Sequence, residues 1–174
     1  MYLLTGFMRK ILIAIFIVAG LAHSTWAAGT KGSSTRWVGK VTHVTDGDTL
    51  WVRKAGVPEP VKLRLEGVDA PEICQAHGQA SRQALADLVL NEVVVVQGRR
   101  RDSFGRLVAR LSVHGDDVGS LLVAQGHAWS YHYRKGQGPY AAQETHARAA
   151  RRGLFAQPGA AQPRDFRKRH GSCH

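Results

Sequence analysis

The sequence predicts a mainly β fold with helices (α+β), an OB-type five-stranded β-barrel on which about three α-helices pack. Five short segments carry either the two-residue alternation or the apolar run of β-strands. An amphipathic helical segment stands between the third and fourth of them, and two more helical segments follow the fifth. An open α+β sheet has the same order of strands and is the alternative.

Each predicted strand depends on its own local pattern. The dipeptide Asp46-Gly47 is typical of a hairpin turn and separates the first two strands, and a second turn precedes the third. The fourth strand is an apolar run, and the fifth alternates between apolar and polar residues. The predicted strands span residues 37–44, 49–53, 61–65, 93–96 and 107–113.

The helices are predicted where the apolar period changes. Residues 78–90 repeat apolar side chains every three or four positions, which indicates an amphipathic helix. Asp117 is suited to begin a second helix that Gly126 ends, and Pro139 to begin a third that continues to about Arg152.

Three segments are expected to lie outside the folded domain. Residues 1–27 combine two basic residues, a short apolar run and small residues before a cleavage point, which predicts a secretory signal peptide. An uncleaved membrane anchor is the alternative. Residues 28–36 predict a flexible leader, residues 37–157 the domain itself, and residues 158–174 a basic flexible tail.

The chain is strongly basic, with a formal net charge of +11 over 174 residues. Removing the signal peptide takes away two cations and no acid, so the positive charge belongs to the exported protein. This balance predicts a polyanionic partner such as nucleic acid, anionic lipid or polysaccharide. Solubility alone is the other explanation.

The two cysteines, Cys74 and Cys173, form an even pair in a chain that is expected to be exported. An oxidising compartment favours a disulfide between them, which would tie the loop after Glu72 to the C-terminal tail. A single pair is the smallest possible disulfide framework, so the sequence leaves this bond open.

Oxygen-bearing side chains gather in two stretches. In Asp46-Gly47-Asp48-Thr49, two carboxylates and a hydroxyl suit a hard cation such as Ca²⁺, although an ordinary hairpin turn explains the same residues. Asp69 could complete the site, and the Ala70 carbonyl offers a further oxygen before a proline that prevents regular pairing.

The stretch from Arg64 to Glu72 also holds the residues expected to act on a substrate. Glu72 could accept a proton from a water near the metal, with solvated surface charge as the alternative. The basic segment 98–106 is expected to form a loop that presents Arg106, and two guanidinium groups, Arg64 and Arg106, could clamp one phosphate. For Arg99–Arg101, a nonspecific basic surface is the better interpretation. A cation, a carboxylate and two arginines are the groups that phosphodiester hydrolysis requires.

Four motifs occur in a fixed order: D-G-D-T, R-L-x-G-V-D-A-P-E, D-x-F-G-R and L-V-x-x-G-x-A-W. In this order they resemble thermonuclease-type proteins, the staphylococcal nuclease family, over residues 37–155. The resemblance implies a five-stranded OB-type barrel with three helices. It also implies Ca²⁺-dependent cleavage of DNA and RNA that leaves 3′-phosphate ends.

The resemblance implies a role for individual residues as well. The implied catalytic residues are Arg64, Glu72 and Arg106. The implied calcium ligands are Asp48, Asp69 and the backbone carbonyl of Ala70, with Asp46 and Thr49 close behind them. Tyr131 and Tyr133 resemble the family's aromatic wall, which would stack on bases and favour single strands, although a core position for one of them is the alternative. The chain departs from the family's pattern at Ala70, at Phe104 and in the short loop that contains Cys74.

Two other classes of protein are weighed against a nuclease. One is a catalytically inactive OB-fold protein that binds nucleic acid or another polyanion, and the other is a polyanion-binding protein that acts through its basic tail. The presence of Arg64, Glu72 and Arg106 together favours the enzyme. The exported chain is expected to be a secreted or periplasmic monomer without a stable protein partner and without a membrane contact.

Overall fold

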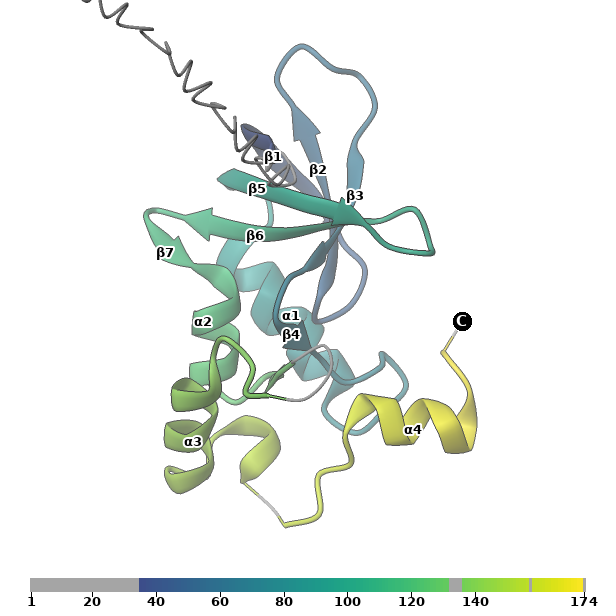
Figure 1. The fold of residues 1–174 in the computed structure, drawn as a ribbon, viewed down its shortest axis with the longest axis vertical. Helices are drawn as coiled ribbons and strands as arrows, with labels where there is room; N and C mark the ends of the chain where they lie inside the picture. The colour runs from purple at the N-terminus through teal and green to yellow at the C-terminus, as the bar shows by residue number, and fades with distance from the viewer. Residues whose placement is uncertain (1–34, 132–135, 157, 174) are drawn as a thin grey trace, which may run out of the picture. The chain divides into compact units, whose positions relative to one another are not determined.

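The computed structural model describes residues 35–131, 136–156 and 158–173 (Figure 1). The predicted signal peptide, nearly all of the predicted leader, and Tyr133 lie outside the described residues. The long strands are β1 (Thr35–Val44), β2 (Thr49–Lys54), β3 (Val61–Leu65), β5 (Val93–Arg101) and β6 (Leu107–Val113). Three two-residue strands are β4 (Val68–Asp69), β7 (Asp116–Asp117) and β8 (Trp129–Ser130). The helices are α1 (Gly78–Val89), α2 (Val118–Ala124), α3 (Ala141–Ala149) and α4 (Pro163–His170), with a 3₁₀ turn at Gly153–Phe155.

The five long strands close into a mixed barrel. Their order is β3-β2-β1-β5-β6, and a parallel pairing of β3 with β6 joins the two edges, with Leu63 opposite Leu107. The other neighbours in this barrel are antiparallel. The predicted OB-type barrel is therefore confirmed, and the open-sheet alternative is wrong.

Alternating apolar residues of the strands fill the barrel, because successive side chains of a strand point to opposite faces. Leu50, Leu63 and Leu111 are essentially inaccessible to solvent, as are Leu85 and Val89 of α1, which lies below the barrel in Figure 1. A second, smaller core lies outside the barrel and consists of Trp129, Ala147, Leu154 and Phe155.

Strand β5 is longer than the sequence predicted. The predicted strand ended at Val96 and was followed by a basic loop over 98–106, whereas β5 continues to Arg101. A register shift between Gly98 and Arg100 bends the strand, and only residues 102–106 form the turn into β6. The arginines of this part are exposed, so they carry no apolar alternation that would mark a strand.

The three predicted helices are present. Helix α1 ends one residue before the predicted boundary, and the side chain of Asp117 begins α2 by accepting a hydrogen bond from the Ser120 amide (2.9 Å). No helix among the described residues is long and apolar enough to cross a membrane.

A fourth helix, α4, occupies much of the segment that was predicted to be a flexible tail. Pro163 stands at its first turn, where the missing amide proton costs nothing, and Gly171 follows its last residue with a positive φ of 76°. The disulfide Cys74–Cys173 joins the end of this segment to the loop before α1.

Candidate active site

A tight turn brings Asp48 to the end of the barrel. The Thr45 amide donates to the Thr49 carbonyl across the turn (2.8 Å), which closes the hairpin between β1 and β2. A Cβ atom at Gly47 would collide with Ser81 of α1 and would lie 2.7 Å from the Cβ of Ala70. Glycine therefore allows the turn to lie against α1 and against the segment that contains Ala70.

A second turn brings Asp69 to the same place. Gly67 follows β3 with a φ of +76°, a conformation that side chains other than glycine rarely adopt. The chain changes direction there and forms β4, which pairs with β8 so that Asp69 lies opposite Trp129. The Ala70 amide then donates to Oδ2 of Asp48 (3.3 Å), which joins the two turns.

The guanidinium group of Arg64 spans the two aspartates. Its Nη1 donates to Oδ1 of Asp48 (2.9 Å), and its Nη2 donates to Oδ1 of Asp69 (3.1 Å). Asp48 and Asp69 are 4% and 5% exposed, so both ion pairs are largely withdrawn from solvent. Asp48, followed by Asp69, raises the pKa of Arg64 further, which keeps this side chain charged in spite of its burial.

The single positive charge of Arg64 does not neutralise all the acids around it. Burial, together with the nearby charge of Asp48, raises the pKa of Asp46 to about 7. Burial also raises the pKa of Asp69, again with the charge of Asp48 acting in the same direction. Shifts of this sign mean that a further positive charge at the cluster would be favourable.

The acids and the threonine of this cluster fit a hard divalent cation, because each of them offers an oxygen atom as a metal ligand. Oδ1 of Asp46 accepts from the Asp48 amide (3.0 Å), and Oγ1 of Thr49 donates to Oδ1 of Asp48 (2.9 Å), so both residues contact Asp48, one of the predicted ligands. In the described part of the chain, no three histidine, cysteine or acidic side chains form a ready-made metal site. Here Arg64 lies between Asp48 and Asp69, the two predicted ligands.

The second predicted arginine, Arg106, comes from the turn between β5 and β6. Asp102 fixes it, since its carboxylate accepts from the Arg106 amide (3.0 Å) and from Nε of Arg106 (2.8 Å). Nη1 of Arg106 lies 3.3 Å from Oγ1 of Thr49, the hydroxyl that also contacts Asp48. Arg64 and Arg106 therefore approach the same aspartate, one directly and one through Thr49.

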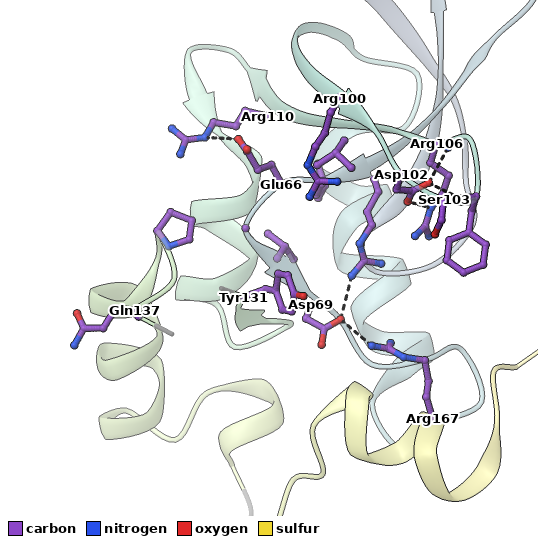
Figure 2. Close-up of a pocket in the computed structure, with 18 residues that line it drawn as sticks. Glu66, Asp69, Arg100, Asp102, Ser103, Arg106, Arg110, Tyr131, Gln137 and Arg167 are labelled. Carbon is purple, nitrogen blue, oxygen red and sulfur yellow. Dashed lines mark hydrogen bonds and ion pairs between the residues drawn. The ribbon is translucent and has the colours of Figure 1, made fainter. Parts of the chain in front are cut away.

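A cleft of about 600 Å³ extends from these arginines along the barrel (Figure 2). Tyr131, 39% exposed, lies in it beside Asp69, and its role as a surface on which bases stack stays a prediction. Phe104 is 81% exposed, and the guanidinium carbon of Arg106 lies 5.2 Å from the centre of its ring. Phe104 also lines the cleft, so its exposed ring offers a second surface on which a base could stack.

Glu72 is paired with a residue that the sequence did not suggest. Nη1 of Arg167, from α4, donates to Oε1 of Glu72 (2.6 Å), and Nη2 of Arg167 lies 3.7 Å from Oδ1 of Asp69. In the sequence, the pair of cysteines was the one feature that could have indicated this contact. Glu72 stands two residues before Cys74, and Arg167 stands six residues before Cys173.

The charges of this cleft suit a phosphodiester, whose cleavage adds negative charge that arginines can neutralise. Such a cleft at one end of a small barrel fits a hydrolytic nuclease. The comparisons with known proteins agree. A family model described as "Staphylococcal nuclease homologue" matches residues 62–157.

Three relatives cover most of the chain. Protein ParB of Escherichia coli is 35% identical over 75% of this chain and 78% of its own length. The micrococcal nuclease of Shigella flexneri is 33% identical, over 75% of this chain and 80% of its own length. An uncharacterized endonuclease of Haemophilus influenzae is 32% identical, over 74% and 72%. The chain belongs to the family of staphylococcal nuclease homologues, and it is a hydrolytic nuclease whose substrates are nucleic acids.

Proposed function

We propose that this protein is an exported, calcium-dependent endonuclease that hydrolyses DNA and RNA and leaves 3′-phosphate ends. The observation that carries the proposal is the position of Arg64, which contacts both Asp48 and Asp69 at the end of the cleft that also holds Arg106. Asp48, Asp69 and the Ala70 carbonyl would hold the calcium ion. When bound, that ion would supply positive charge next to the phosphate.

Residues of the chain itself would bind the phosphate, position the water and assist the leaving oxygen. Arg64 and Arg106 bind the oxygens of the scissile phosphate through their paired N–H groups and stabilise the charge that develops there. Glu72 orients the attacking water or accepts its proton. Water attacks phosphorus as the bond to the 5′-oxygen breaks, and Arg106 assists the departure of that oxygen. The phosphate then stays on the 3′-oxygen.

Single strands are the proposed preference of the site. Tyr131 and Phe104 expose aromatic faces along the cleft, and stacking on such faces requires bases that are not paired in a duplex. We also propose that the chain acts as a monomer after removal of residues 1–27, in the periplasm or outside the cell. Sedimentation of the purified protein and the N-terminal sequence of the exported form test these two statements.

The reaction is tested with a single-stranded oligonucleotide in the presence of excess Ca²⁺. We expect wild-type protein to shorten it, EGTA to abolish cleavage, and Glu72→Gln to reduce kcat on the order of 10²- to 10⁴-fold, because the proton acceptor is lost. Glu59→Gln, which removes an exposed acid in the turn before β3, is the matched control and should cleave normally. Product ends that accept label from a polynucleotide kinase without prior dephosphorylation would support the 3′-phosphate assignment.

Two results would contradict the proposal in different ways. Binding of the oligonucleotide without cleavage at any calcium concentration would favour the inactive, nucleic-acid-binding alternative. Cleavage that is equally fast in EGTA would support the nuclease activity but contradict the proposed calcium requirement.

A further inference from the structure

Helix α4 lies outside the segment that the family model matches, yet it reaches the predicted active site. Arg167 projects from this helix toward Asp69 (Figure 2). It pairs with Glu72 at 2.6 Å and approaches Oδ1 of Asp69 to 3.7 Å. Oδ1 of Asp69 is also the atom that Arg64 contacts, so the two guanidinium groups stand beside one carboxylate oxygen.

Contacts beyond both ends of the helix hold α4 in this position. Before the helix, the Gln75 side chain donates to the Ala161 carbonyl (2.6 Å). After the helix, Cys173 is bonded to Cys74. Both contacts are with the short loop that follows Glu72. The segment that contains α4 is therefore attached at two points to the loop beside Glu72.

Arg167 also faces the space where a phosphate would bind. It lines the same cleft as Arg64 and Arg106, and its side chain is 33% exposed. Among the described residues, only one of its N–H donors makes a hydrogen bond, the one to Glu72. A guanidinium group has five such donors, so the others are available to the oxygens of a phosphate.

We infer that Arg167 is a third phosphate-binding residue of this nuclease, and that α4 is a part of its substrate site. This inference rests on the proposed roles of Arg64 and Arg106 as phosphate ligands. The competing interpretation is that Arg167 blocks the site by holding Glu72 and Asp69, in which case its removal would help the enzyme.

The test compares Arg167→Ala with Lys168→Ala, because each removes one positive charge from α4 and the ion pair of Lys168 is with Asp165 of the same helix. Binding of a fluorescent oligothymidylate is measured in EDTA, where no cleavage is expected, at several salt concentrations. We expect Arg167→Ala to weaken binding on the order of tenfold and to reduce the salt slope by about 0.7, the value for one phosphate contact on a single strand. Lys168→Ala should change both quantities much less.

Cleavage kinetics in Ca²⁺ provide a second readout. Arg167→Ala should raise KM, and Arg167→Lys should restore part of the lost binding, because lysine keeps the charge but not the planar fork. The lysine variant also keeps the test valid if the alanine variant folds poorly, which a thermal melt would show. Equal effects of the two alanine variants, or faster cleavage by Arg167→Ala, would overturn the inference. If wild-type protein itself neither binds nor cleaves, the proposed function fails instead.

Discussion

A single oxygen atom, Oδ1 of Asp69, is approached by guanidinium groups from two distant parts of the chain. Arg64 comes from the barrel, and Arg167 comes from α4. Without these cations, the ionised carboxylates of Asp48 and Asp69 would be unpaired at a site that is largely withdrawn from solvent. The arginines therefore stabilise the acids in the resting protein, and a divalent cation is expected to take over part of that role.

A pair of histidines outside the site predicts how stability depends on pH. Nε2 of His77 lies 3.1 Å from Nδ1 of His127, an arrangement that requires one nitrogen to accept a hydrogen bond. Burial lowers the pKa of both residues below the ordinary 6.5, and the charge of His77 lowers that of His127 further. At these two histidines the unfolded chain therefore binds more protons than the native one just below pH 6.5, so the pair's contribution to stability should fall as the pH falls through this range. Asp46, whose pKa is raised, acts in the opposite direction.

Urea unfolding at pH 7.5 and pH 5.5 measures this dependence. We expect His127→Asn to lose less stability than the wild type between the two values, because it removes one of the coupled groups. His43→Gln, at an exposed position of β1, is the control and should retain the wild-type dependence. Equal changes in the free energy of unfolding between the two pH values for the wild type and for His127→Asn would contradict the prediction.

Among the elements, the turn between β1 and β2 does most to place the acids. Its close contact with α1 and with Ala70 depends on the missing side chain of Gly47. Asp48 is the next residue, so a displaced turn would also displace the predicted metal ligand.

Gly47→Ala is expected to cost about 2–3 kcal/mol of unfolding free energy, because the added methyl group collides with Ser81 in a packed region. Gly56→Ala is the comparison variant. Gly56 has a positive φ of 74° but open space around its Cβ position, so that change should cost only about 1 kcal/mol. Urea titrations of both variants measure the difference. Equal costs would show that the turn can move away from α1.

The elements also show which parts of the fold local patterns can predict. Helix α1 was predicted to within one residue, because its apolar face lies on the barrel. Helix α4 was missed because only Pro163 among its residues is buried, so it has no apolar period. A disulfide and ion pairs hold it instead, and these join residues nearly a hundred positions apart.

The candidate site likewise has features that local patterns predict and features that they do not. The motifs predicted Arg64, Asp48, Asp69 and Arg106, and the structure brings all four to one end of the barrel. No local pattern could show that β3 pairs with β6 in parallel, although this pairing sets Arg64 opposite Val108, two residues after Arg106. The partner of Glu72 depended on a helix that was not predicted.

At the scale of the whole molecule, the net charge of +11 and the cluster of buried acids have opposite consequences. The positive charge attracts a polyanion from a distance, and under the proposed function the acids would give a divalent cation a local site within that field. Binding of such a cation should therefore be visible as increased stability of the entire fold.

We expect Ca²⁺ at about one hundred times its dissociation constant to stabilise the protein by about 2.7 kcal/mol, because it binds only the native state. Thermal melts with Ca²⁺ and with EGTA measure this gain. Asp48→Asn should lose most of it, whereas Asp116→Asn, at an exposed acid in β7, should keep it. An unchanged melting temperature of the wild type at all calcium concentrations would contradict the predicted site.

The bond between Cys74 and Cys173 turns the stretch between them into a covalent ring. Arg64 lies before this ring, while Arg106 and Arg167 lie within it. A protease that cuts one peptide bond anywhere between the two cysteines would open the ring but could not release a fragment. The three arginines would remain on one molecule, so a singly nicked enzyme could keep its substrate site assembled.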